Sequence, residues 1–449
     1  MSASAAGLRT LADLRAGRLH GARELKLLHA GLDSFPREIF ALADTLEVLD
    51  LSGNALTALP EDFARLRHLR ILFASDNPFT RLPDVLGECP ALEMVGFKAN
   101  RIDQVPAAAL PPRLRWLILT DNRIAALPDD IGRCGRLQKL MLAGNRLTAL
   151  PDTLAACRRL ELLRIADNRL AALPDWLPAL PRLAWLAFAG NPFAQASETL
   201  AVATHPVADI DWSRLALHEL LGEGASGRIH RADWTDAAGQ VHAVAVKLFK
   251  GAVTSDGSPS SEMDACIAAG AHPALIAVRG RLQGHPQGTP GLVLDLVAPA
   301  WRNLAGPPSL QSCTRDVYAP GLRLRLAHVL ALAGGIASAV RQLHARGITH
   351  GDLYGHNILW DGGAGALLGD FGAASFSVPG RAQAVSVQRV EVRAFGCLLE
   401  ELLAHSDADD GAADIRQALQ ALQARCDAAD PAARPDFAEI DETLAALRS

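Results

Sequence analysis

Asparagine recurs at a nearly constant interval through the first part of the chain. Successive members of the series are separated by 23, 23, 22, 23, 23 and 23 residues. They are Asn54, Asn77, Asn100, Asn122, Asn145, Asn168 and Asn191. A fixed period of this length is typical of solenoids, in which each structural repeat packs only against its neighbours. The period therefore predicts a solenoid before any other property of the chain is considered.

Each repeat also carries apolar residues at fixed positions. They stand eight, five and three residues before the asparagine, as Leu114, Leu117 and Leu119 do before Asn122, and a proline follows six residues after the first six asparagines. The pattern resembles the leucine-rich repeat family over about residues 22 to 196, which implies a horseshoe of about eight repeats. Alternation before each asparagine predicts a short strand with its apolar side inward. The asparagine amide can satisfy the backbone groups of the turn that follows.

The start of the repeat series looks like an end cap. The first copy, LKLLHAGLDSFP, has Ala30 where asparagine is expected, and a helix-like segment without repeat register precedes it. Terminal repeats of solenoids are usually atypical because one of their faces has no neighbouring repeat.

Residues six positions before each asparagine alternate away from the core and should line the concave face. This concave row comprises Val48, Ile71, Met94, Trp116, Lys139, Leu162 and Trp185. Six of the seven are apolar, and a row of this kind predicts a docking surface. We expect it to bind a protein substrate or partner, or the chain's own second half. The alternative is a set of scattered apolar residues with no partner.

Composition limits the remaining possibilities. At about 150 residues per domain, 449 residues predict two or three domains. Lys+Arg 44 against Asp+Glu 49 leaves a net charge of −5, which indicates neither nucleic acid nor an anionic membrane as partner. Seven cysteines form no CxxC pair, which favours a reducing compartment.

The chain shows no sequence signal for export or for membrane insertion. Its first residues carry charges and lack an apolar signal-peptide core. The most apolar later stretch, residues 322–340, is interrupted by Arg323, Arg325 and His328, so we expect no membrane span there. These features predict a cytoplasmic protein.

The repeat fades after Phe193, and a new pattern begins near Ile210, so we predict domains over residues 1–205 and 206–449. The segment LLGEGASGRI places Gly222, Gly224 and Gly227 where backbone amides could approach phosphates closely.

An unusual lysine follows the glycine-rich segment about twenty residues later. Lys247 ends VAVK in an alternating apolar run that predicts a strand, unlike a dinucleotide-binding fingerprint, which opens a helix. Five of the chain's 44 basic residues are lysines, so a site that needs a compact ammonium would explain this exception.

Two further motifs follow in order. HGDLYGHNIL places Asp352 and Asn357 five residues apart, and LLGDFG places Asp370 thirteen residues after Asn357. Together with the glycine-rich loop and the strand lysine, they resemble the eukaryotic-type protein kinase family over about residues 210 to 445. The resemblance implies a bilobal α+β domain after the α/β solenoid.

The resemblance also implies roles for these residues with ATP and Mg²⁺ as cofactors. Lys247 would hold the α- and β-phosphates, Asn357 and Asp370 would hold Mg²⁺, and Asp352 would accept the proton of the substrate hydroxyl. LVLDLV looks like the hinge that takes adenine through backbone groups, which points to Asp295 and Val297.

Lys247 also needs a carboxylate that orients its ammonium. Glu262 is the expected partner, and Asp264 is the alternative because the spacing from Glu262 to Pro273 is about one residue longer than usual.

Several positions depart from the kinase pattern. Gly351 replaces the arginine that usually receives an activation-loop phosphate, so switching by phosphate on Ser375, Ser377 or Ser386 is expected to be absent. Tyr354 and His356 stand where lysine or arginine would indicate the acceptor type. Glu391 is expected to replace the helix-F aspartate. Arg434 lacks its usual glutamate because there is no Ala-Pro-Glu, and its partner stays open.

These departures leave three functions open. The first is an active protein kinase acting on Ser/Thr, with Tyr open. The second is a nucleotide-binding scaffold with weak catalysis, and the third is a small-molecule kinase of the aminoglycoside type. Retention of the metal and catalytic positions favours the first. The long concave surface also suits a macromolecule better than a metabolite.

Overall fold

The computed structural model describes residues 4–224, 226–251, 253–407 and 413–448. By packing, the chain divides into two compact units. The first comprises Met1–Leu163 and Asn168–Leu180, and the second comprises Arg164–Asp167 and Pro181–Ser449. The last repeat strand and Arg164 therefore belong to the unit that holds the second half of the chain. The family boundary at residue 205 stays a prediction.

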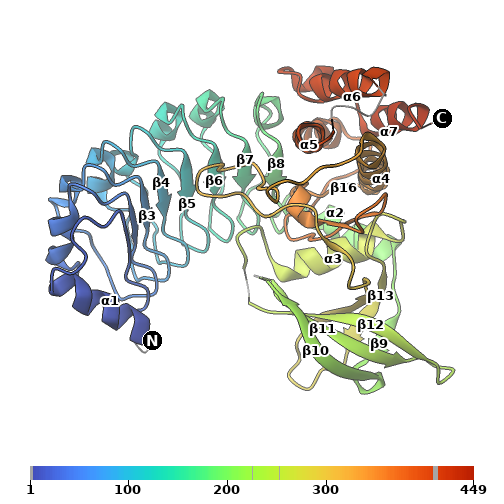
Figure 1. Ribbon diagram of the computed structural model, residues 1–449, viewed down its shortest axis with the longest axis horizontal. Coiled ribbons are helices and arrows are strands. Elements are labelled where there is room, and N and C mark those ends of the chain that lie inside the picture. Colours follow the sequence, from blue (N-terminus) through green and yellow to red (C-terminus); the bar gives the residue numbers. More distant parts are fainter. Residues whose placement is uncertain (1–3, 225, 252, 408–412, 449) are drawn as a thin grey trace. The chain divides into compact units, whose positions relative to one another are not determined.

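The repeats form one parallel sheet of eight strands in sequence order (Figure 1). The strands are β1 (Glu24–Lys26), β2 (Val48–Asp50), β3 (Ile71–Phe73), β4 (Met94–Gly96), β5 (Trp116–Ile118), β6 (Lys139–Met141), β7 (Leu162–Arg164) and β8 (Trp185–Ala187). The connecting 3₁₀ helices are Arg37–Leu42, Phe63–Arg65, Asp84–Glu88, Ala107–Ala109, Asp129–Arg133, Asp152–Ala156 and Leu177–Ala179. The predicted repeats are thereby confirmed.

The asparagine side chains connect successive repeats through hydrogen bonds. The Asn122 amide nitrogen donates to Leu119 in its own repeat and to Phe97 in the preceding one, at 3.0 and 2.8 Å. Its Oδ1 accepts from the backbone amide of Ile102 at 2.9 Å. The asparagine thus bonds to backbone groups of its own repeat and also to the turn of the preceding repeat. It can do so because the parallel strands stack in register.

The residue before each repeat asparagine adopts a left-handed backbone conformation. The φ angles are 75° at Gly53, 70° at Gly144 and 72° at Gly190, and 51–55° at the four non-glycine positions. Those positions are Asp76, Ala99, Asp121 and Asp167. Glycine adopts this conformation without cost, and aspartate tolerates it, whereas alanine is strained there.

The predicted end cap is a helix that closes the first strand. α1 (Ala5–Arg15) begins at Ser4, whose hydroxyl accepts from the amide of Gly7 at 3.0 Å. The amide of Ala30, at the aberrant first asparagine position, donates to Asn54 Oδ1 at 2.9 Å. The first copy thus uses the side chain of the second repeat.

The concave row is less exposed than predicted. Ile71, Met94, Lys139, Leu162 and Trp185 are buried, with 1–7% of their surface exposed. Parallel pairing sets neighbouring members of the row side by side at a spacing of about 5 Å. Most of the row is therefore not open to solvent in the structure.

Two members of the concave row remain half-buried, namely Val48 and Trp116. The ammonium of Lys139 lies 4.4 Å from the centre of the Trp116 ring. This is a cation–π contact. Of the two tryptophans in the row, Trp116 is the one that is partly accessible.

The second unit begins with a six-stranded sheet in the order β10-β11-β12-β14-β13-β9. Its strands are β9 (Asp209–Asp211), β10 (Leu215–Glu223), β11 (Gly227–Thr235), β12 (Val241–Phe249), β13 (Val278–Gln283) and β14 (Gly291–Asp295). Two helices belong to this part, α2 (Gln195–Thr204) and α3 (Pro259–Ala269). The Ser258 hydroxyl accepts from the amide of Ser261 at 3.2 Å and so fixes the start of α3.

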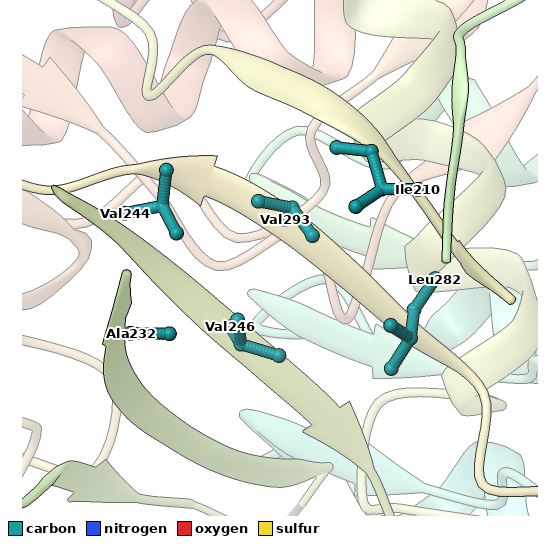
Figure 2. Packing of buried hydrophobic residues seen from close by; sticks show 6 residues of the cluster. All are labelled: Ile210, Ala232, Val244, Val246, Leu282 and Val293. Atoms are coloured by element: carbon teal, nitrogen blue, oxygen red, sulfur yellow. The ribbon is translucent and has the colours of Figure 1, made fainter. Parts of the chain in front are cut away.

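One face of this sheet is a compact apolar core. Figure 2 shows its six side chains, which come from β9, β11, β12, β13 and β14. They are Ile210, Ala232, Val244, Val246, Leu282 and Val293. Val244 and Val246 are two residues apart and therefore share one face of β12. Lys247, the next residue along, points to the opposite face by the same alternation.

Four α-helices follow the six-stranded sheet in the described part of the second unit (Figure 1). They are α4 (Leu326–Ala345), α5 (Ala382–Ala404), α6 (Ala413–Cys426) and α7 (Phe437–Ala446). The short strands are β15 (Arg302–Asn303), β16 (Ile348–Thr349), β17 (Ile358–Trp360), β18 (Ala366–Leu368) and β19 (Ser375–Phe376). Further 3₁₀ helices are Trp212–Arg214, Gly355–Asn357 and Pro431–Ala433. The predicted fold class, a repeat solenoid followed by a bilobal α+β domain, is confirmed.

α4 is the one helix among the described residues that is long and apolar enough to cross a membrane by length and composition. It begins after Arg323 and Arg325, so these charges do not interrupt it as the sequence analysis assumed. Most of its apolar window, 61%, is buried inside the second unit. A core helix passes the same test, so the feature is weak evidence for a span.

Candidate active site

Lys247 on β12 forms an ion pair with Glu262 on α3. The Lys247 side chain is 14% exposed and that of Glu262 1%. Burial lowers the pKa of Lys247, but the Glu262 carboxylate outweighs it and raises the pKa above its usual value. Asp264, the alternative partner, lies 3.4 Å from Arg281 instead. The ammonium is therefore charged and held by Glu262.

The glycine-rich segment connects β10 and β11. Ser226 lies in it, and residue 225 lies outside the described residues. A side chain at Gly227 would lie 2.5 Å from the Leu248 carbonyl oxygen, so close strand packing requires glycine there. A Cβ at Gly222 or Gly224 would meet no atom within 4 Å. The space beside these two glycines is thus open, although the Gly224 amide donates to the Gly227 oxygen at 2.9 Å within the turn.

Asp352 and Asn357 lie in the loop between β16 and β17. The Asn357 amide nitrogen donates to the backbone oxygen of Asp352 at 2.9 Å and to its Oδ2 at 2.7 Å. Both donations use the amide nitrogen, so the Asn357 Oδ1 is left without a hydrogen-bond partner among the described residues. The asparagine therefore orients the carboxylate and keeps an oxygen for a cation.

Asp370 follows β18 and is brought to the same loop by its neighbours. The backbone amide of Gly369 donates to the Asn357 carbonyl oxygen at 2.9 Å, and His350 Nε2 contacts the Gly369 oxygen at 2.9 Å. The ring of Phe371 lies 5.0 Å from that of His350. Asp370 itself has φ 54°, a conformation rare for non-glycine residues and concentrated at functional sites.

The predicted adenine-binding segment ends β14. The backbone amide of Asp295 donates to the Ala277 oxygen at 2.9 Å, so this amide is already used within the sheet. Its carboxylate pairs with Arg279. Val297 lies two residues beyond the strand, and its backbone makes no hydrogen bond within the described part of the chain. Of the two predicted residues, Val297 is the one with free backbone groups.

These residues fit ATP with Mg²⁺. The Asn357 Oδ1 and the exposed carboxylate of Asp370 are oxygen ligands of the kind Mg²⁺ prefers. Within the residues that the structure describes, no three His, Cys, Asp or Glu side chains form a group that could hold a metal. Two protein ligands are consistent with Mg²⁺, because this ion usually keeps waters and phosphate oxygens as its other ligands.

Comparison with known proteins identifies both parts. Residues 20–79 and 112–170 match the leucine rich repeat family. Residues 215–391 match the protein tyrosine and serine/threonine kinase family, and this range includes all the predicted site residues from Gly222 to Asp370. The chain contains leucine-rich repeats and a protein kinase domain.

The individual relatives share a limited part of the chain. Human PH domain leucine-rich repeat-containing protein phosphatase 1 is 35% identical over 108 residues, 23% of this chain and 6% of its own length. Human leucine-rich repeat-containing protein 58 is 37% identical over 123 residues, 25% of this chain and 33% of its own. Probable inactive serine/threonine-protein kinase roco10 of Dictyostelium discoideum is 32% identical over 123 residues, which are 26% of this chain and 5% of its own length.

The chain thus spans a third or less of the length of these curated relatives. Among solved structures, a leucine-rich repeat protein of Leptospira interrogans is 25% identical with a TM-score of 0.35. The match covers 40% of this chain and 52% of that one.

One residue of the repeats contacts the site and was missed by the sequence analysis. Arg164, at the end of β7, is 1% exposed and donates to Asp352 Oδ1, to the Gly351 oxygen at 2.9 Å and to Asp256 Oδ1 at 2.6 Å. Burial opposes ionisation of Asp352, but Arg164 outweighs it and holds the pKa of this carboxyl below its usual value. The sequence signal was weak: Arg164 is the one arginine at its repeat position, four residues before asparagine.

The missing arginine at position 351 has a steric reason. Gly351 has φ 74°, and a Cβ there would lie 2.4 Å from the Ala373 oxygen and 2.7 Å from the Leu186 oxygen. No side chain fits without movement of the backbone. The guanidinium of Arg164 instead reaches the carbonyl of this residue.

Tyr354 and Arg434, which also depart from the kinase pattern, have clear partners in the structure. Tyr354 stacks on Trp185, with ring centres 4.3 Å apart and planes at 5°. The Arg434 guanidinium is 1% exposed and donates to the backbone oxygens of Ala428, Arg389 and Pro181 at 2.9–3.0 Å. Backbone carbonyls therefore replace the absent glutamate as the partner of Arg434.

Proposed function

We propose that the chain is an ATP-dependent protein kinase that transfers a phosphoryl group to Ser or Thr hydroxyls of a protein, with Tyr as an open alternative. The observation that carries the proposal is the buried ion pair between Lys247 and Glu262 beside Asp370. A charged ammonium inside a domain requires a function or a partner. Here the Glu262 carboxylate fixes it on β12, the strand that pairs with β11 directly after the glycine-rich segment.

The chain's own residues have separate tasks in this proposal. When bound, Mg·ATP supplies the phosphoryl group and the cation that shields its charge. Lys247 binds phosphate oxygens, and Asn357 with Asp370 offers oxygen ligands. Asp352 accepts the proton of the acceptor hydroxyl, oriented by the amide of Asn357. Positioning and charge, rather than covalent chemistry, are what this set of side chains can provide.

Calorimetry of ATP binding with and without Mg²⁺ tests the proposal. We expect Mg²⁺-dependent binding by the wild-type chain and loss of the Mg²⁺ dependence in Asp370→Asn. Asp414→Asn, the same substitution at an exposed position on α6, serves as the control and should bind as the wild type does. Absence of Mg²⁺-dependent nucleotide binding in the wild type would remove the chemical basis of the proposal.

The repeats are proposed to recruit the protein substrate or another protein partner. Leucine-rich repeats present an extended surface that suits a macromolecule. Trp116 is the accessible aromatic of the concave row, and truncation of such an anchor typically costs about 2 kcal/mol or more of binding energy. Trp116→Ala should weaken capture of the protein substrate while phosphorylation of a generic peptide is unchanged. Equal loss of both activities would show that the residue supports the fold instead.

One observation favours a second candidate, a nucleotide-binding scaffold with little turnover. The carboxylate of Asp352 is occupied by Arg164 in the structure. In a scaffold this contact would be permanent, and removal of Arg164 would release no activity. The two candidates therefore differ in a measurable way.

A further inference from the structure

We propose that Arg164 and strand β8 hold the kinase domain in an autoinhibited state, by binding the catalytic carboxylate of Asp352 and covering the loop that carries it. This inference rests on the proposed kinase function. Arg164 and β8 belong to the same compact unit as the kinase domain. The inhibitory residues are therefore part of this unit in the structure and need no added ligand.

Arg164 uses its whole guanidinium on the site. Nη2 donates to Asp352 Oδ1, Nη1 to the Gly351 oxygen at 2.9 Å and Nε to Asp256 Oδ1 at 2.6 Å. Such a planar fork matches carboxylates and carbonyls better than an ammonium does. Asp256 precedes α3, so the same arginine connects the segment before α3 to the catalytic loop.

The contact occupies the proton acceptor. Oδ2 of Asp352 accepts from Asn357, and Oδ1 accepts from Arg164, so both carboxylate oxygens are engaged. A hydroxyl donor must reach one of these oxygens for proton transfer. The side chain of Asp352 is 16% exposed, which leaves little room for an acceptor. Arg164 therefore competes directly with the acceptor hydroxyl for the base.

Strand β8 covers the rest of the loop. The Trp185 indole N–H donates to the Leu353 oxygen at 3.1 Å, and its ring stacks on Tyr354. The amide of Phe188, directly after β8, donates to Ser375 Oγ at 2.8 Å, so the end of β8 also lies against the segment after Asp370. Ser375 is fully buried, and of the three serines in this segment it is the one that accepts a hydrogen bond from the residue after β8. A protein acceptor cannot reach Asp352 along this side of the loop while β8 lies there.

Removal of Arg164 should raise activity, whereas loss of a merely structural residue would lower it. We would measure phosphorylation of a generic protein acceptor and Mg·ATP affinity for the full chain and for Arg164→Ala. If most molecules are closed at any time, activity is proportional to the open fraction. We expect kcat/KM for the acceptor to rise at least roughly tenfold, with the ATP dissociation constant unchanged.

Two variants keep the test interpretable. Arg169→Ala removes the same charge from an exposed position five residues away and should leave the rate as in the wild type. Asp256→Asn keeps the shape of the site and removes one anchor of Arg164 without touching Asp352. It should raise the rate in the same direction by a smaller factor. If Arg164→Ala fails to fold in thermal unfolding, Asp256→Asn still decides the question.

The outcomes separate the inference from the proposed function. If the wild type binds Mg·ATP and neither Arg164→Ala nor Asp256→Asn raises transfer, autoinhibition is refuted while the nucleotide site stands. If no variant binds Mg·ATP, the proposed kinase function fails and the inference fails with it. A fall in activity in Arg164→Ala with unchanged folding would show that Arg164 supports catalysis and would also refute autoinhibition.

Discussion

Glu391 on α5 accepts a hydrogen bond from the backbone amide of Gly351 at 2.7 Å. Its other carboxylate oxygen contacts His344 Nε2 at 2.7 Å. Burial opposes ionisation of Glu391, but the His344 hydrogen bond outweighs it and lowers the pKa of the carboxyl. The loop that carries Asp352 is thus held at its backbone by a charged buried group. A chain without an arginine at position 351 can therefore still fix this loop.

Lys247→Met should abolish phosphoryl transfer and leave the fold intact. The ammonium is needed for charge rather than packing, so we expect transfer to fall by about 100-fold or more. Lys26→Met, at an exposed lysine of the first strand, should have no effect. A kinetic assay with a generic protein acceptor measures the difference, and transfer within a factor of about two of the wild type would contradict the assigned role.

The same substitution should make folding more sensitive to pH. Burial already raises the pKa of Glu262, and Lys247 partly offsets this. Without Lys247, the folded-state pKa of Glu262 rises further, so ionisation costs stability as pH rises above its unfolded value of 4.5. The thermal midpoint of Lys247→Met should therefore fall below that of the wild type more at about pH 8 than at about pH 5.

His356 should stabilise the fold at low pH. Burial lowers its pKa, but the hydrogen bond and charge of Asp316, at 2.7 Å, outweigh burial and raise the pKa above 6.5. The stabilisation is fully present below the unfolded pKa and is lost as pH rises through the folded pKa. The thermal midpoint difference between wild type and His356→Gln should shrink from about pH 5.5 to about pH 9. His20→Gln is the exposed control, and a difference that grows with pH would contradict this sign.

Asn122→Ala should destabilise the repeats strongly. The substitution removes the partner of the Ile102 amide and of the Phe97 carbonyl in a buried turn, whereas the Leu119 carbonyl still accepts from Asn145 at 2.9 Å. Each buried orphan costs about 1–3 kcal/mol, so we expect a loss of about 3 kcal/mol in urea unfolding. Asn100→Ala, at a half-buried asparagine where water can replace the side chain, should cost less. Equal costs would show that the hydrogen bonds do not set the effect.

Ala99→Gly should stabilise the chain. Ala99 stands before a repeat asparagine with φ 53°, where glycine occurs in three other repeats. A left-handed alanine costs about 1–2 kcal/mol, which exceeds the extra entropy that glycine loses on folding, so we expect a gain of about 0.5 kcal/mol. Ala107→Gly, in the Ala107–Ala109 helix, should destabilise by a similar amount. The urea unfolding midpoints of both variants measure these two changes in stability. A lower midpoint for Ala99→Gly than for the wild type would contradict the strain argument.

The repeat architecture could be predicted because the same residue types recur at a fixed interval along the sequence. Residues at fixed offsets from each asparagine define the strand, the turn and the buried face, and each repeat confirms the register of the next. The kinase motifs were similarly local, since HxDxxxxN places Asp352 and Asn357 on one short loop. Glu262 was expected as the partner of Lys247 from the resemblance to kinases, with Asp264 as the alternative, and the structure pairs Lys247 with Glu262.

Arg164 could not be predicted, because its contacts have no local pattern. It lies 188 residues from Asp352 along the sequence and 92 from Asp256. The residue four positions before the repeat asparagine, where Arg164 stands, differs from repeat to repeat, so the repeat pattern does not single it out. Burial of the concave row was missed for a related reason, since alternation gives the direction of a side chain but not what covers it. Trp185 is the clearest case, because it stacks on Tyr354 rather than facing solvent.

Mass-spectrometric mapping of the products formed from ATP tests the central claim most directly. The reaction would contain a generic protein acceptor and an aminoglycoside together, with the wild-type chain, Arg164→Ala and Asp352→Asn compared. We expect phosphate on hydroxyl side chains of the protein acceptor, most with Arg164→Ala and none with Asp352→Asn, although the latter still binds Mg·ATP. Phosphate on the aminoglycoside alone, or on neither acceptor with any variant, would contradict the protein kinase function.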